Sequence, residues 1–148
     1  MKKFLNNQFF MIIAAMIFFG VQKVNAQTTL SQVKSIMRDR GWIATADSRY
    51  AYLKEGESTT DWYRIFYSTL EYAIVAYSDD EDVLDIDLQL NDAYGEAYIK
   101  DDEFDEFSIL QFTPAYTISL GIKMTNYSSI EKYLTSKCNY TIFYRTTD

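Results

Sequence analysis

The pattern of apolar and polar residues changes character along the chain, and after Trp42 it repeats every second residue. The clearest stretch lies between residues 83 and 91. A strand with this alternation buries one face and exposes the other. The two faces are, on one side, Leu84, Ile86, Leu88 and Leu90, and on the other, Asp85, Asp87 and Gln89. We therefore expect a half-buried strand that shows water a row of carboxylates.

Similar short runs, rich in aromatic and β-branched residues, follow one another at intervals of about ten residues. They cover Tyr50 and Tyr52 and then residues 62–67, 72–77, 83–91, 96–100, 107–112, 116–124 and 140–145. No helical pattern separates them, and there is no linker or repeat. The sequence predicts a mainly β protein, an antiparallel, jelly-roll-like β-sandwich of seven or eight strands that forms one domain over residues 27–148.

One short helix is expected before the strands, at about residues 29–41. Thr28 or Thr29 can cap its start, and its apolar residues recur at helical spacing. Gly41 follows two arginines and is a natural stop. The helix is amphipathic, so we expect it to cover the sheet, with a role in binding a partner as the alternative.

The first 26 residues read as a Sec-type export signal that is cleaved before Gln27. A basic start precedes an apolar run of 13 residues, 9–21, and Val24-Asn25-Ala26 supplies small residues for cleavage. The run is shorter than the ~20 residues that span a bilayer, so no stable membrane anchor is expected after cleavage. The cleavage point has no Cys, which argues against a lipoprotein. The protein is expected to be secreted or periplasmic.

The net charge and the absence of His exclude several classes of function. Without residues 1–26, 11 basic side chains remain against 21 acidic ones, a formal net charge of −10. Nucleic acid is therefore a poor partner. The chain has no His, so Ser-His and Cys-His nucleophiles are excluded. Asp85 and Asp87 could form a glycosidase-like pair, but no cleft is evident around them. We expect no catalytic residues. Cys138, the one Cys, is expected to be buried, with an intermolecular disulfide as the alternative.

The strongest chemical feature is a belt of 14 acids and one base between Glu71 and Glu106. Ca²⁺ binds six to eight hard oxygen ligands, which loops of this composition can supply. If the turns meet at one end of the sandwich, Asp82, Asp85, Asp101 and Asp102 are the candidate calcium ligands. The spacing is not that of an EF-hand. The alternative is a solvated acidic surface that keeps the protein soluble.

From residue 56 to the C-terminus, the ordered elements resemble the bacterial pre-peptidase C-terminal domains, small β-sandwiches appended to secreted enzymes. The resemblance rests on the Asp-rich strand 82–88, the hairpin 92–95, the acid pair Asp101-Asp102 and the strand that ends in Thr113-Pro114. It implies a jelly-roll-like fold and an accessory, non-catalytic role. No catalytic domain precedes it in this chain, and a Gly usual after the Pro is replaced by Ala115.

The sequence thus predicts a secreted binding or accessory module, with calcium as a candidate stabilising ion. Its expected partner is a protein or a cell-surface glycan. Trp42 and Trp62 are the first aromatic residues to examine as binding platforms, although Trp62 lies in a strand and is expected in the core. The alternative function is an acidic inhibitor or immunity-type protein that covers a basic partner surface.

Overall fold

The computed structural model describes residues 30–147, which form one helix and eight strands. The expected signal peptide, residues 1–26, lies outside the described residues. The elements are α2 (Leu30–Asp39), β1 (Ile43–Leu53), β2 (Trp62–Phe66), β3 (Leu70–Ser78), β4 (Val83–Asn91), β5 (Ala97–Lys100), β6 (Phe107–Phe112), β7 (Ile118–Ser129) and β8 (Ser136–Thr146).

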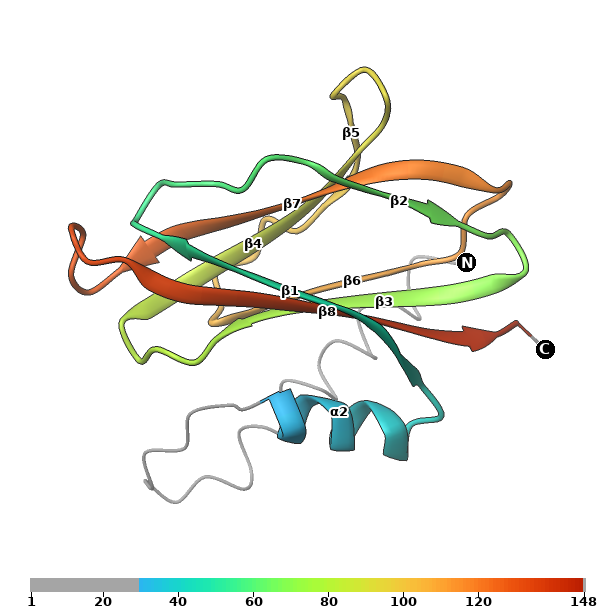
Figure 1. The fold of residues 1–148 in the computed structure, drawn as a ribbon, viewed down its shortest axis with the longest axis horizontal. Coiled ribbons are helices and arrows are strands. Elements are labelled where there is room, and N and C mark those ends of the chain that lie inside the picture. Colours follow the sequence, from blue (N-terminus) through green and yellow to red (C-terminus); the bar gives the residue numbers. More distant parts are fainter. Residues whose placement is uncertain (1–29, 148) are drawn as a thin grey trace.

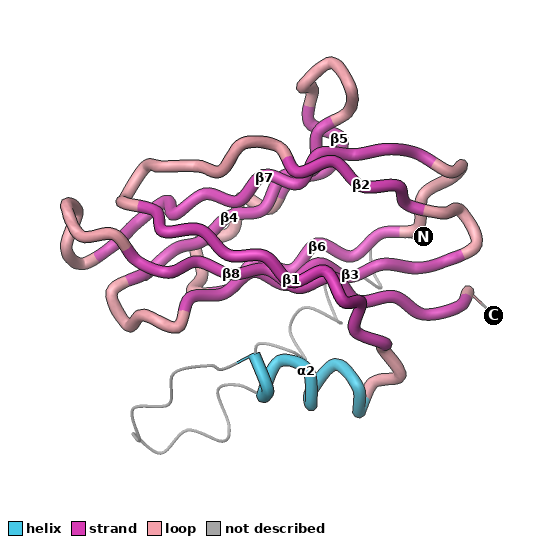
Figure 2. Tube along the Cα trace, viewed as in Figure 1, coloured by secondary structure: helices cyan, strands magenta, loops and turns pink. Residues whose placement is uncertain are grey.

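The strands form two four-stranded antiparallel sheets, one with the order β1-β8-β3-β6 and the other with the order β2-β7-β4-β5. Figures 1 and 2 show the two sheets as stacked layers. The predicted mainly β, antiparallel sandwich is confirmed. The pairings are nested along the chain: β1 with β8, β2 with β7, β3 with β6 and β4 with β5.

The main core lies between the two sheets. Alternate residues of β4, Ile86, Leu88 and Leu90, are fully buried there, as the alternation predicts. They meet Tyr140 and Ile142 of β8 in the same cluster. A sandwich of this kind is stabilised mainly by the apolar area that the inner faces remove from water.

A second, smaller core lies under α2 on the outer face of the first sheet (Figure 1). Val33 and Met37, four residues apart and so on one side of the helix, pack against Val75 and Phe143. The helix therefore covers the sheet, as expected. Within residues 30–147, no helix is long and apolar enough to cross a membrane.

The helix ends in a Schellman motif. The amide of Gly41 donates to the carbonyl of Arg38 (2.9 Å), and that of Trp42 donates to the carbonyl of Met37 (3.0 Å). Gly41 has φ 80°, a conformation that glycine adopts without steric cost. Trp42 is buried in the smaller core, and the Arg145 guanidinium lies 4.3 Å from its ring centre. Trp42 is therefore a structural residue and offers no exposed platform.

Strand β1 is longer than the sequence suggested, and it is interrupted. Its pairing with β8 shifts register between Ala44 and Ser48, so the residues between them bulge out of the ladder. Such a bulge re-aims the side chains that it carries. One of those side chains, Asp47, contributes to the site described below.

Candidate functional site

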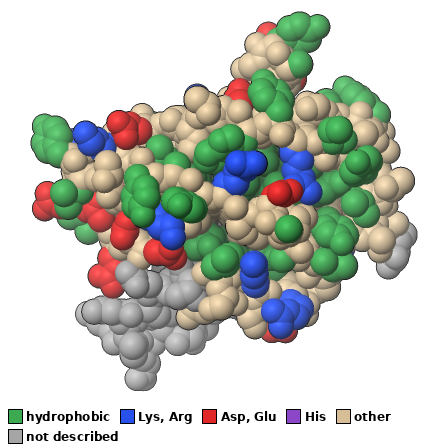
Figure 3. Space-filling model, viewed as in Figure 1, with side chains coloured by type: hydrophobic (Ala, Val, Ile, Leu, Met, Phe, Trp, Pro, Cys, Tyr) green, Lys and Arg blue, Asp and Glu red, His purple; other side chains and the backbone are tan. Residues whose placement is uncertain are grey.

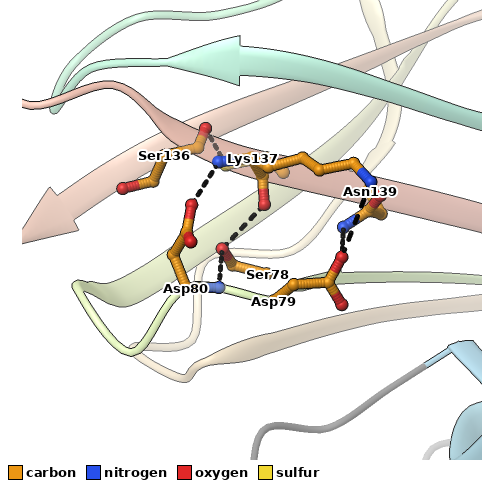
Figure 4. Close-up of polar contacts among 7 residues, drawn as sticks. Ser78, Asp79, Asp80, Ser136, Lys137 and Asn139 are labelled. Carbon is orange, nitrogen blue, oxygen red and sulfur yellow. Dashed lines mark hydrogen bonds and ion pairs between the residues drawn. The ribbon is translucent and has the colours of Figure 1, made fainter.

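The acid belt divides into two groups with different surroundings. The first is the β3–β4 turn, residues 79–82, which Figure 4 shows against the start of β8. Asp80 accepts a hydrogen bond from the backbone amide of Lys137 (2.6 Å). Asp79 accepts one from the Asn139 side chain (3.2 Å) and lies 3.8 Å from the Lys137 ammonium. These carboxylates fasten the turn to β8.

Asp82 belongs to the same structural group. One of its oxygens accepts a hydrogen bond from the backbone amide of Glu131 (2.8 Å), and the other accepts one from the Ser136 hydroxyl (3.2 Å). It thereby holds the β7–β8 connection.

The second acidic group lies beside β4, where residues 101–106 run along the strand. The backbone amide of Ile86 donates to the carbonyl of Asp105 (3.1 Å), and that of Asp101 donates to the carbonyl of Leu88 (2.9 Å). This segment covers Asp85, which is only 4% exposed and accepts a hydrogen bond from the Asp105 amide (3.2 Å). The expected exposed row of carboxylates is therefore wrong at Asp85, because a loop that the alternation of β4 cannot reveal lies over it.

The carboxylates of this group are only partly compensated, and the pKa values of three of its aspartates are raised. Burial, reinforced by the neighbouring Asp85 and Asp101 charges, raises the pKa of Asp87 to about 6. Burial also raises the pKa of Asp85 and of Asp105, and the Asp101 charge adds to both effects. One oxygen of Asp87 and one of Asp101 are buried without a hydrogen-bond partner among the described residues.

The four predicted calcium ligands are therefore only partly brought together. Asp85 and Asp101 belong to the group beside β4, whereas Asp82 serves the β7–β8 connection. Asp102 is exposed and pairs with Lys100 (3.2 Å). Across residues 30–147, no set of three or more His, Cys, Asp or Glu side chains is arranged to hold a metal ion. Calcium binding stays a prediction.

A different site lies at the edge of the sandwich where β1 and β2 face each other. Both are edge strands, each paired on one side only. A cavity of about 160 Å³ enters the space between the sheets at this edge. It is lined by Asp47, Arg49, Trp62, Tyr63, Arg64, Ile122, Tyr140 and Ile142.

Strand register explains why two arginines reach this cavity. Arg49 is paired with Tyr140, and Arg64 is paired with Leu120. Directly paired residues of neighbouring strands share a face of the sheet, and both Tyr140 and Leu120 are buried in the main core. Arg49 and Arg64 therefore lie on the core side of their edge strands, where Arg49 remains exposed to solvent and Arg64 is partly buried.

The two arginines differ in how they are paired. Arg64 forms an ion pair with Asp47, the residue that the bulge of β1 frees from the ladder. Its Nε is nevertheless buried without a partner in the part of the chain that the structure describes. Arg49 has no carboxylate within ion-pair distance among residues 30–147, and its guanidinium lies 5.7 Å from the Trp62 ring centre.

The aromatic residues complete the cavity wall. Trp62 is half-buried, and its ring lies 5.4 Å from that of Tyr140. The expectation that Trp62 belongs to the core is thus half right, because it packs against the main cluster and also lines the cavity. Burial raises the pKa of Tyr140 to about 12 although Arg49 and Arg64 lower it, so its phenol is neutral at pH 7. The face that carries β1 and β2 shows basic and acidic side chains beside hydrophobic ones (Figure 3).

A glycine anchors β2 beside the cavity. Gly121 of β7 is paired with Tyr63, and a Cβ at this glycine would lie 2.7 Å from the Asp61 Cβ and 3.1 Å from the Tyr63 ring. The missing side chain lets Tyr63 lie across β7 and donate a hydrogen bond to the Asp92 carbonyl (3.2 Å). A five-residue edge strand is held in place in this way.

The arginine site was not predicted from the sequence. The available signal was the alternation of Trp62, Arg64 and Phe66, which puts a charge between two residues of the buried face. The sequence carries no signal that Arg64 lies beside Asp47 and Arg49 in the cavity. That arrangement depends on the bulge in β1 and on the packing of one sheet over the other. Compared with known proteins, the chain matches no family model and no curated protein.

Proposed function

We propose that this protein is an exported, non-catalytic binding module that takes its ligand at the β1–β2 edge. The observation that carries the proposal is Arg49, a solvent-exposed cation that lines the cavity and has no carboxylate partner among the described residues. In a protein with 14 basic and 21 acidic residues, carboxylates are abundant partners. A guanidinium left without one is available to an external anion or hydrogen-bond acceptor.

The surroundings of the cavity support a binding role. Tyr50 and Tyr52 on β1, and Tyr63, Ile65 and Tyr67 on and after β2, are each more than half exposed. Exposed tyrosines offer flat, amphipathic contact surfaces at low entropic cost. They flank an edge at which two strands keep one side free of strand pairing.

Two further expectations support an accessory module. The nested pairing of the strands supports the jelly-roll-like connectivity and the resemblance to pre-peptidase C-terminal domains. The leader sequence supports secretion or a periplasmic location. The carboxylates with raised pKa lie under the 101–106 segment and not in the cavity, which supports a non-catalytic role.

The test is retention of native material by the immobilised protein. The protein, its Arg49→Glu variant and the control variant Arg38→Glu are each exposed to the culture medium and surface polysaccharide of the native cells. Arg38 is exposed on α2, away from the cavity, so its variant makes the same change of charge elsewhere. We expect retention that Arg49→Glu abolishes and Arg38→Glu preserves. Equal retention by all three proteins, or none, contradicts the proposal.

The acidic inhibitor is a second candidate, favoured by the crowded carboxylates beside β4. Asp85, Asp87 and Asp105 all have raised pKa values, so a cationic partner would relieve their repulsion. A protein partner that is lost at high salt, weakened by Asp87→Asn and unaffected by Arg49→Glu would support this candidate over the first.

A further inference from the structure

Resting on the binding function proposed above, we propose that the β1–β2 cavity binds a sugar acid, a six-membered ring that carries one carboxylate and several hydroxyl groups. Size is the first argument. The cavity measures about 160 Å³. A protein cavity of about 150 Å³ accommodates one benzene molecule. The site therefore holds one ring at a time, either a free sugar or one sugar residue of a chain.

The charges of the cavity select the ligand's anionic group. Asp47 neutralises Arg64, which leaves the charge of Arg49 to be met by the ligand. One positive charge matches one carboxylate, and a guanidinium binds a carboxylate through two parallel hydrogen bonds. A phosphate dianion carries more charge than the one guanidinium without a carboxylate partner compensates.

The hydrogen-bonding groups select the rest of the ligand. The Arg64 guanidinium is a donor and Asp47 is an acceptor in the same cavity. The Tyr140 phenol is neutral and both donates and accepts. Sugar hydroxyls donate to a carboxylate and accept from a guanidinium, so they satisfy both kinds of group. Phosphate and sulfate chiefly accept, so they can pair with the guanidinium groups but leave the remaining acceptor capacity of Asp47 unused.

The test is a titration followed by two-dimensional ¹H–¹⁵N correlation NMR of the purified protein. The Trp62 indole lies at the cavity and the Trp42 indole lies in the smaller core, so the two signals serve as site and internal control. The probes are galacturonate, galactose, acetate and phosphate at matched ionic strength. We expect galacturonate to shift the Trp62 signal saturably, at least tenfold more tightly than each other probe, and to leave the Trp42 signal in place.

Two variants locate the interactions. Arg49→Gln should weaken galacturonate binding at least tenfold, while the control Arg38→Gln changes it less than twofold. Asp47→Asn should reduce the preference for galacturonate over acetate at least threefold, because the hydroxyl groups lose their acceptor. The dispersion of the backbone signals shows whether each variant is folded.

The source of the sugar acid is distinguished by a further arm with polygalacturonate. Saturable shifts with the free acid alone indicate a free small molecule, and shifts with the polymer indicate an acidic polysaccharide. Phosphate binding as tightly as galacturonate, or galacturonate binding that survives Arg49→Gln, overturns the ligand class. If native material is still retained through Arg49 in that case, the binding function survives. If no native material is retained through Arg49, the binding function fails as well.

Discussion

Two regions of the sandwich gather charged side chains, the segment beside β4 and the β1–β2 edge. The first holds charges of one sign, and the second holds charges of both signs. Beside β4, like charges gather under the 101–106 segment, and the pKa values of Asp85 and Asp87 rise. At the β1–β2 edge, Asp47, Arg49 and Arg64 mix both signs around an open cavity. Crowded like charges destabilise the folded protein, and binding of protons or cations removes part of that repulsion. In the mixed-charge cavity, by contrast, Arg49 can bind an external anion. The first region is therefore best probed through stability and the second through binding.

The largest expected effect tests whether inward-facing positions of β2 are core positions. Phe66, two residues after Arg64, is fully buried, with its ring 4.9 Å from that of Tyr72 and 5.1 Å from that of Phe112. Phe66→Ala should lower the free energy of unfolding by about 3–5 kcal/mol. The matched control is Ile65→Ala on the outward face, 52% exposed, which should cost about 1 kcal/mol or less. Equal losses in urea titrations would show that β2 is not docked as described.

The next effect sharpens the account of the acidic region. The pKa of Asp87 is raised from 3.8 to about 6, so the folded state holds its proton more tightly than the unfolded state. Stability from this group is present below pH 4 and is lost as the pH rises through 6. Asp87→Asn should therefore stabilise the protein at pH 7, by up to about 3 kcal/mol, and flatten the dependence between pH 4 and 6. Denaturant titrations across that range measure both.

A control variant separates Asp87 from a general loss of negative charge. Glu81 is exposed in the β3–β4 turn. Glu81→Gln should change stability by less than about 0.5 kcal/mol at pH 7 and leave the pH dependence intact. If Glu81→Gln stabilises as much as Asp87→Asn, net charge and not the local cluster is responsible.

Calcium binding provides a further test of the acidic region. If Ca²⁺ binds the folded state alone, a hundredfold excess over Kd stabilises it by about 2.7 kcal/mol and raises the melting temperature by about 4–8 °C. Mg²⁺ at matched ionic strength should do nearly as well if the ion only screens repulsion. Asp101→Asn together with Asp102→Asn should abolish the calcium-specific part. If Ca²⁺ raises the melting temperature no more than Mg²⁺ does, the carboxylates beside β4 form a repulsive cluster without a calcium site.

The sequence predicted the fold more fully than it predicted the site. Alternation of apolar and polar residues is a local property, so β4 and β6 were predicted with the bounds that the structure gives them. The burial of Asp85 was not predicted, because it depends on the 101–106 segment that lies over β4. The cavity depends on a bulge that turns Asp47 and on two edge strands whose arginines, Arg49 and Arg64, are 15 positions apart in the chain. Such contacts are tertiary, and a single sequence does not encode them in its periodicity.

The smallest expected effect on stability is also the one that separates the two regions most cleanly. Arg49 is exposed, and within residues 30–147 its guanidinium lies over the Trp62 ring, 5.7 Å from the ring centre, with no carboxylate at ion-pair distance. A cation over an aromatic ring at an exposed site contributes about 0.5–1 kcal/mol. Arg49→Gln keeps the alkyl stem and removes the charge, so the free energy of unfolding should fall by no more than about 1 kcal/mol, with no change in its pH dependence between pH 4 and 7. The variant should nevertheless lose the ligand. A large loss of stability would make Arg49 a structural cation like Arg145, which pairs with Glu71 (2.6 Å) and covers Trp42. If Arg49→Gln costs little stability and abolishes binding, Arg49 is a ligand-binding residue and not a structural one.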